Sequence, residues 1–319
     1  MTDPAQAVFE QTIIMFMIVI IGALCYKFKL INDDGKKQLS NLVLNVVNPL
    51  LIFLSYQTDM RPELIEGFLW TGAMGVLTYI LFIFASKLIF PQKEGRDTII
   101  ERFSVIYSNF AFMGTPLIFG VFGSDGVFMQ TGFITVSNLF IWTHGVMMMT
   151  SGRADSPKPH DALLRALRSP AIIAVAAGLI LLFTRIKLPG MVYTALNNVA
   201  EMTTPLAMIV AGASIMSAGL LGSIKNLRVY LVSAVRLLLM PALGIAAVLF
   251  IPCPDIPKLI TIIEFSCPVA AVGTMFAIRY DRDSHYAAQV FAVSTLLSAG
   301  VLPLVVLGAT SLMEVLHGV

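Results

Sequence analysis

Long apolar runs make up most of the chain, and short polar segments separate them. Ten of these runs hold the ~20 mostly apolar residues that a helix needs to cross the hydrocarbon core of a bilayer. The runs cover residues 8–28, 38–57, 66–89, 99–122, 125–149, 170–186, 191–218, 228–250, 257–279 and 285–310. The pattern therefore predicts an all-α membrane protein with ten transmembrane helices.

The composition excludes several other classes of protein. Of the 319 residues, 57% are hydrophobic and 13% are charged, whereas a soluble domain carries about 25% charged residues. The mean hydropathy is +0.84. A net charge of +2 gives no basis for nucleic-acid binding, and the three cysteines form no disulfide framework. We expect a protein embedded in a lipid bilayer rather than a soluble enzyme.

The Lys and Arg residues indicate an orientation. If both termini are placed outside, only four of the 21 Lys and Arg residues lie on the outer side, and Arg236 lies within a span. The other sixteen then lie in the inner connections, as the positive-inside rule requires. The four outer residues are Arg61, Arg185, Lys187 and Lys258. We therefore predict a multi-pass protein of a plasma or inner membrane with both termini on the non-cytoplasmic side.

A polar segment divides the spans equally. Residues 151–169 form the longest polar stretch and separate residues 1–150 from residues 170–319. Each part holds five predicted spans. Because five is odd, two related halves would be inverted relative to each other in the membrane, and the segment between them would be a cytoplasmic connecting loop.

Prolines recur at similar places in the two halves. Pro49 and Pro205 are 156 residues apart, and Pro116 and Pro268 are 152 residues apart. Proline removes a backbone donor, so a break within a membrane helix is tolerated mainly where it is buried or faces water. Inverted repeats with broken helices at equivalent positions are typical of secondary transporters. We expect true breaks at Pro116 and Pro268, with a simple kink as the alternative at each proline.

Few residues in the spans carry chemistry. No metalloprotease helix, serine nucleophile elbow or phosphate-binding loop is present, which predicts that the chain is not an enzyme. Intramembrane ionisable residues are functional candidates by default. Glu264 is a candidate cation or proton site, or a structural partner of Arg236. Arg236 either attracts an anionic substrate or extends toward the cytoplasm.

The predicted fifth span carries a polar stripe. Thr131, Thr135 and Asn138 share one helical face. Such a stripe lines a cavity beside the breaks or supplies hydrogen bonds between helices.

Four stretches of the chain resemble the auxin efflux carrier family, which includes bacterial organic-acid carriers and the plant PIN carriers. The most specific is the Ser-Asn…Gly-x-Pro run of the fourth span. The stretches are Leu44–Phe53 (LNVVNPLLIF), Phe103–Phe119 (FSVIYSNFAFMGTPLIF), Pro205–Ile215 (PLAMIVAGASI) and Cys267–Asp283 (CPVAAVGTMFAIRYDRD). The resemblance covers essentially the whole chain, and the short central loop is typical of a bacterial-type member.

The resemblance implies the ten-helix inverted repeat shared with bile acid–sodium symporters and NhaA-like antiporters. Spans one, two, six and seven, with Pro49 and Pro205, would form a scaffold. Spans three to five and eight to ten would form a mobile domain, in which broken spans four and nine cross. It also implies a homodimer through the scaffold helices.

The resemblance further implies a function. The substrate would be a small organic anion, such as an auxin or a mono- or dicarboxylate, moved by alternating access. The substrate region would include Asn109, Gly114, Pro116 and Pro268. The places of Asn138 and Arg236 within the spans add these two residues to it. Ser108, Asn109 and Glu264 lie where the bile-acid relatives bind sodium, with Thr131 and Thr135 as further oxygen donors. Sodium coupling, proton coupling and uncoupled transport remain open, an anion channel is the alternative from another class, and no other cofactor is expected.

Overall fold

The computed structural model describes residues 4–59, 61–92, 98–151, 160–161, 164, 167–217 and 226–317. Most of these residues are helical, and they contain no strand, only an isolated bridge between Ser108 and Val269. Most of the predicted connecting segment 151–169 lies outside them.

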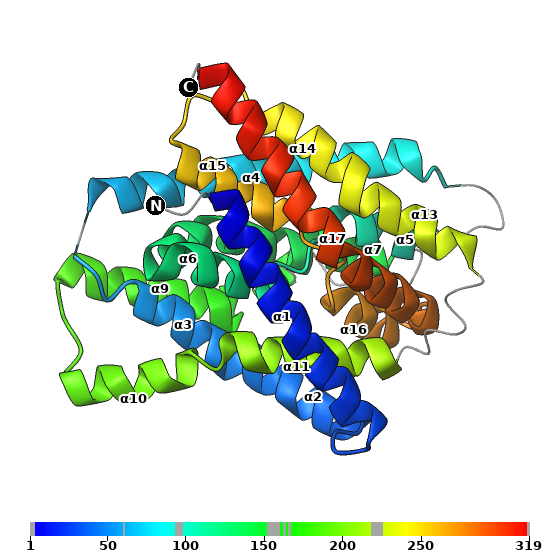
Figure 1. Ribbon diagram of the computed structural model, residues 1–319, viewed down its shortest axis with the longest axis horizontal. Helices are drawn as coiled ribbons and strands as arrows, with labels where there is room; N and C mark the ends of the chain where they lie inside the picture. Colours follow the sequence, from blue (N-terminus) through cyan, green and yellow to red (C-terminus); the bar gives the residue numbers. More distant parts are fainter. Residues whose placement is uncertain are drawn as a thin grey trace.

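The helices of the first half are α1 (Pro4–Lys27), α2 (Asp33–Leu42), η1 (Val43–Val47), α3 (Asn48–Ser55), α4 (Pro62–Ile89), α5 (Ile99–Ile106), η2 (Phe110–Gly114), α6 (Thr115–Phe140), η3 (Ile141–Gly145) and α7 (Val146–Met149). Those of the second half are α9 (Pro170–Thr184), α10 (Gly190–Ala200), α11 (Thr203–Ser217), α13 (Leu227–Ala234), η4 (Val235–Leu239), α14 (Met240–Val248), α15 (Asp255–Ser266), α16 (Val272–Arg279) and α17 (Ser284–His317). The four η elements are π-helical turns. In Figure 1, α1 begins and α17 ends toward the upper left of the view, and both helices have their other ends toward the lower right.

Seven helical segments within the described residues are long and apolar enough to cross a membrane. Six of them match predicted spans one, two, three, seven, eight and ten. The seventh holds both the end of predicted span four and all of span five. The segments are Gln6–Lys27, Asp33–Ser55, Pro62–Ile89, Phe110–Met149, Gly190–Ser217, Leu227–Val248 and Ser284–Met313.

The 40-residue segment Phe110–Met149 is a hairpin rather than one rod. Gly123 has φ 63° and ψ −155°, a conformation that glycine adopts without strain. A Cβ added to Gly126 would lie 3.2 Å from Ile118 Cγ2, although eight residues of continuous helix would separate them by ~12 Å. The chain therefore reverses at Gly123, between predicted spans four and five.

The remaining predicted spans are shorter helices. The 15 residues of α9 match the start of predicted span six and cover ~22 Å. The predicted spans 99–122 and 257–279 are interrupted, the first between α5 and η2 and the second between α15 and α16. With 8, 12 and 8 residues, α5, α15 and α16 are too short to appear among the long apolar helices.

Three of the four π-helical turns end two residues before a proline, namely Pro49, Pro116 and Pro241. A proline ring clashes with the carbonyl group four residues earlier and cannot donate to it. The wider π-turn relieves this conflict, so the helix continues through each proline. The break predicted at Pro116 consequently lies upstream, at Tyr107–Asn109, and Pro116 occupies the first turn of α6. In the second half, Pro205 lies in the first turn of α11, after a two-residue turn that follows α10.

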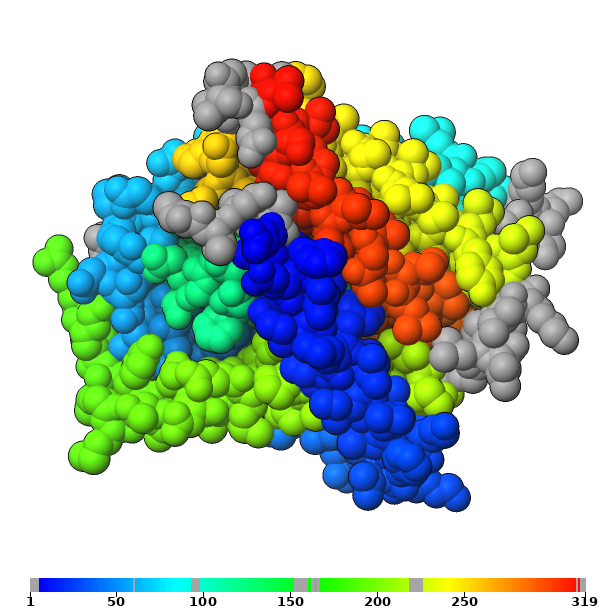
Figure 2. All heavy atoms as spheres, in the orientation of Figure 1, coloured from blue at the N-terminus to red at the C-terminus, as the bar shows by residue number. Residues whose placement is uncertain are grey.

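Four long-range helix pairs organise the molecule: α1 packs on α11, α3 on α9, α4 on α6, and α13 on α17. The first pair is closest where Gly22 lies against the backbone of Ile209 and Gly212 lies against the backbone of Val19. Small residues permit such close approach between membrane helices. Figure 2 shows α1 and α17 across the front of the molecule, with α10 and α11 toward the lower left of the view.

The outer surface is apolar and the interior holds many polar groups. Exposed side chains recur along α1 at helical spacing, among them Phe9, Ile13, Met17 and Leu24. A lipid environment accounts for such a surface because it solvates these side chains as well as the protein interior does. The structure therefore agrees with a multi-pass membrane protein.

Candidate functional site

The two interrupted segments meet in the interior of the molecule. Asn109 N donates to Pro268 O at 2.8 Å, and Ala270 N donates to Tyr107 O at 3.0 Å. Val269 N donates to Ser294 Oγ of α17 at 3.2 Å. We call this region, Tyr107–Asn109 with Cys267–Ala271, the crossing. Each break satisfies backbone groups of the other, which makes both breaks tolerable inside a membrane.

The local sequence explains the second break. Pro268 has no N–H, and a residue that precedes proline is biased toward extended backbone. Cys267 adopts that conformation, with φ −57° and ψ 151°. The predicted break at Pro268 is therefore confirmed.

Glu264, in the last turn of α15, is a fully buried carboxylate. Its Oε1 accepts a hydrogen bond of 2.8 Å from Gln130 Nε2, and the same amide group donates to Thr115 Oγ1 at 3.0 Å. The carboxylate lies against Gly114, where an added Cβ would collide with Oε1. Glycine at position 114 therefore allows the carboxylate to approach the first turn of α6.

Several buried polar atoms around the crossing have no hydrogen-bond partner among the described residues. Among them are Asn109 Nδ2, Gln130 Oε1, Glu264 Oε2 and Ser266 Oγ. Buried polar atoms in native proteins nearly always have partners, and exceptions mark water, ion or ligand positions. The crossing is thus the candidate binding site.

These atoms define the chemistry that the site can accept. Oxygen atoms of Gln130, Glu264 and Ser266 suit a hard cation, while Asn109 Nδ2 is a donor suited to an anion. Among the described residues, no group of three or more His, Cys, Asp or Glu side chains is placed to hold a metal ion. With a single carboxylate, the residues present fit a monovalent cation better than a divalent one.

The site residues predicted from the sequence separate into two groups. Ser108, Asn109, Gly114 and Glu264 lie at or beside the crossing. Arg236 is also fully buried there, with its hydrogen bonds directed to backbone carbonyl groups.

The predicted polar stripe of α6 lies on another face. Thr131 Oγ1 is hydrogen-bonded to the hydroxyl of Tyr56, the residue that follows α3. Thr135 donates to Thr131 O at 2.8 Å, and Asn138 donates to Ile134 O at 2.9 Å. The stripe therefore bonds to the C-terminal end of α3 and to its own helix rather than to Glu264.

Two site residues, Ser266 and Gln130, were not predicted from the sequence; the more informative is Gln130. It is adjacent to Thr131, and neighbouring residues of an α-helix point ~100° apart. When Thr131 faces α3, the side chain of Gln130 therefore reaches the crossing. The only signal in the sequence was a long uncharged polar side chain in an apolar span.

The fold and the crossing together define a class. Several helices are long and apolar enough to cross a membrane, and two broken segments meet in the interior beside a buried carboxylate, which is the arrangement of membrane transport proteins. The chain belongs to the auxin efflux carrier family, whose profile, described as membrane transport protein, matches residues 7–306.

Two archaeal relatives are similar over nearly their full lengths. An uncharacterized transporter of Methanothermobacter thermautotrophicus is 24% identical over 302 residues, which cover 92% of this chain and 96% of the relative. An uncharacterized transporter of Methanocaldococcus jannaschii is 24% identical over 311 residues, with the same two coverages. The protein is accordingly a membrane transporter.

Proposed function

We propose that the protein is a secondary active transporter of small organic anions, either auxin-like acids or mono- and dicarboxylates. The observation that carries this proposal is the crossing. The N-terminal ends of η2 and α16 meet there, beside the unpartnered amide of Asn109. Helix N-termini bear partial positive charge and free N–H groups, which favour a carboxylate. The substrate site comprises Asn109, Gly114 and the backbone near Pro116 and Pro268.

Two inverted five-helix repeats, ten spans in total, form the proposed architecture. The packing partners support it, because equivalent helices of the two halves make equivalent contacts. α1 packs on α11 as α9 packs on α3, and α4 packs on α6 as α13 packs on α17. The first two contacts run between the halves and the last two lie within them, as expected when residues 1–150 and 170–319 repeat one fold.

Transport would proceed by movement of one group of helices against another. The scaffold would hold α1, α2, η1, α3, α9, α10 and α11, and the mobile group would hold α4 to α7 and α13 to α17. Among the described residues, two hydrogen bonds join the groups, one between Tyr56 and Thr131 and one from Asn48 Nδ2 to Ala111 O at 3.1 Å. Both would break and re-form in each transport cycle.

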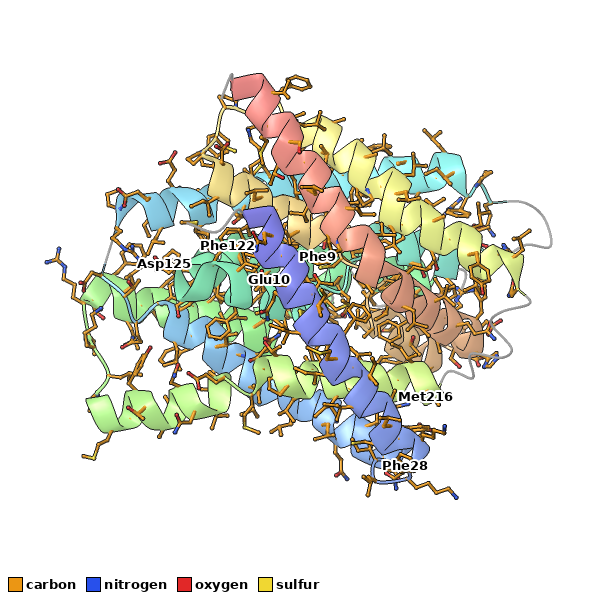
Figure 3. All side chains as sticks on the ribbon, in the orientation of Figure 1. Phe9, Glu10, Phe28, Phe122, Asp125 and Met216 are labelled. Atoms are coloured by element: carbon orange, nitrogen blue, oxygen red, sulfur yellow. The ribbon has the colours of Figure 1, made fainter. Side chains whose placement is uncertain are left out.

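The charged residues support an orientation with both termini outside. In Figure 3, Asp125 lies at the left of the view, whereas Phe28 and Met216 lie at the lower right. Lys27 and Lys29 flank Phe28 in the sequence. The end that carries Phe28 would face the cytoplasm of a cell with a plasma or inner membrane.

Sodium is the coupling ion that we favour, and a proton is the alternative. A buried carboxylate with one protein donor is costly unless a proton or a cation neutralises it. Glu264 Oε2 would bind sodium together with oxygen atoms of Ser108, Asn109, Gln130 or Ser266. Thr131 and Thr135 would act less directly, through the position of α6. A homodimer through the scaffold helices completes the proposal, and native mass spectrometry in mild detergent tests it.

Transport into liposomes tests the function directly. Purified protein would be reconstituted and given labelled indole-3-acetate, malate or malonate under imposed sodium or proton gradients. We expect uptake against the anion gradient and exchange with unlabelled anion preloaded inside. An anion channel would instead pass anions only down their gradient, without exchange. Absence of both uptake and exchange for every organic anion would refute the proposed substrate class.

A further inference from the structure

Arg236 occupies an unusual position for a charged residue. It lies in the π-turn η4, between α13 and α14, and its side chain is fully buried. A guanidinium within a membrane segment requires partners for all of its donors. The partners of Arg236 are carbonyl oxygen atoms of the two broken segments, rather than a carboxylate.

Five hydrogen bonds join Arg236 to both sides of the crossing. Nε and Nη2 donate to Cys267 O, each at 3.0 Å, and Nη2 donates to Phe265 O at 2.6 Å. Nη1 donates to Val105 O at 2.9 Å and to Ile106 O at 3.4 Å. Three of these carbonyl groups belong to the last turns of α5 and α15, and the fourth belongs to the residue that follows α15. One side chain thus caps two helix C-termini that are more than 150 residues apart in the sequence.

This capping has an electrostatic consequence. Each helix C-terminus carries about half of a negative elementary charge, so the ends of α5 and α15 together carry about one. The guanidinium supplies one positive charge at that place. The negative helix ends are therefore neutralised, while the positive ends of η2 and α16 remain at the crossing.

We propose that Arg236 is a positioning residue that joins the two half-helix C-termini and makes the crossing selective for anions, without contact to the substrate. The electrostatic part rests on the proposed function, because it assumes that the crossing binds an anion. The joining part does not depend on any substrate. In this arrangement Arg236 acts through α5 and α15, and Asn109 and the helix N-termini contact the anion.

The test compares Arg236→Gln and Arg236→Lys with a matched control. Arg282 also donates to carbonyl groups near a helix end, Met149 O at 3.0 Å and Ser151 O at 2.6 Å, but these bonds lie away from the crossing. Arg282→Gln therefore removes a similar arginine cap. The readouts are hydrogen–deuterium exchange without substrate and affinity for a mono- and a dicarboxylate.

We expect residues 103–112 and 263–272 to exchange at least tenfold faster in Arg236→Gln, and at the wild-type rate in Arg282→Gln. Affinity should fall at least tenfold, by the same factor for the monoanion and the dianion. Arg236→Lys keeps the charge with fewer donors and should show a smaller change of the same kind. If Arg236→Gln does not fold, the exchange and affinity of Arg236→Lys provide the test.

Two results would overturn the inference. Unchanged exchange at the crossing in Arg236→Lys and in any folded Arg236→Gln would show that Arg236 does not join the half-helices. A loss confined to the dianion would show that Arg236 contacts the substrate. If the wild type binds no organic anion but exchange rises as expected, the proposed function fails while the joining role of Arg236 stands.

Discussion

Gln130 Nε2 donates a hydrogen bond to Glu264 Oε1 at 2.8 Å, and both side chains are fully buried. The contact joins residues 134 positions apart and connects α6 to α15 beside the crossing. The amide oxygen of Gln130, Oε1, and the second carboxylate oxygen of Glu264, Oε2, have no partner among the described residues. The two residues therefore bond to each other, and each keeps one acceptor oxygen that a ligand can use.

Gln130→Leu should destabilise the protein by about 1–3 kcal/mol, because the buried carboxylate loses its protein donor. Glu264→Gln should reduce that cost, because the neutral amide demands less of its surroundings. A thermal-unfolding double-mutant cycle in detergent measures the coupling, which we expect at about 0.5–3 kcal/mol. Gln289→Leu, in which the lost bond is to His285 on the same helix, is the control. Additive effects of Gln130→Leu and Glu264→Gln would contradict the contact.

Gly114→Ala should impair both stability and transport. The added Cβ would collide with Glu264 Oε1, so the carboxylate must move at a cost of about 1–3 kcal/mol. Gly308→Ala is the matched control, because a Cβ there meets nothing within 4 Å and alanine is the better helix former. Unfolding temperatures and liposome uptake of both variants provide the comparison. Equal behaviour would mean that Glu264 does not need the space at Gly114.

Asn109→Ala should abolish anion binding and leave a folded protein. The backbone N–H of Asn109 donates to Pro268 O, and the substitution retains this bond. Only the unpartnered side-chain amide is lost. Binding is measured by the stabilisation that a saturating carboxylate confers, and Asn45→Ala, which removes an exposed amide bonded to its own helix, is the control. Normal anion binding by Asn109→Ala would place the substrate elsewhere.

Much of the fold could be predicted from the sequence because lipid constrains it strongly. Six predicted spans correspond to long apolar helices, and the predicted gap at 122–125 contains the reversal at Gly123. The break at Pro268 followed from the missing N–H of proline. The break before Pro116 was misplaced because the π-turn η2 absorbs the strain of that proline, and the sequence pattern does not indicate where such turns form.

The site was harder to predict than the fold. Intramembrane charge identified Glu264 and Arg236 as candidates, since each is costly in lipid. Their partners could not be predicted in the same way. Arg236 bonds to carbonyl groups, which every residue possesses, and Gln130 was distinguished from Thr131 only by the rotation of α6 about its axis.

Labelling of single cysteines tests the proposed orientation. In a chain without Cys25, Cys253 and Cys267, an impermeant maleimide should label Lys187→Cys in intact cells. His160→Cys should react only after the cells are permeabilised. Both positions are exposed at the surface, so access to the reagent is set by the membrane. The reverse pattern would place both termini in the cytoplasm.

The coupling ion is tested at Glu264. A buried carboxylate must be neutralised before a substrate anion enters the same region, because two like charges in a site of low dielectric repel each other strongly. If sodium supplies that charge, sodium should raise the unfolding temperature relative to choline and increase the affinity for the anion. Since Glu264→Gln removes the charge, it should abolish both effects while the protein remains folded. If a proton supplies the charge, the wild type should respond to pH but not to sodium, and a proton gradient alone should drive uptake. A sodium response that persists in Glu264→Gln would exclude Glu264 as the ion site.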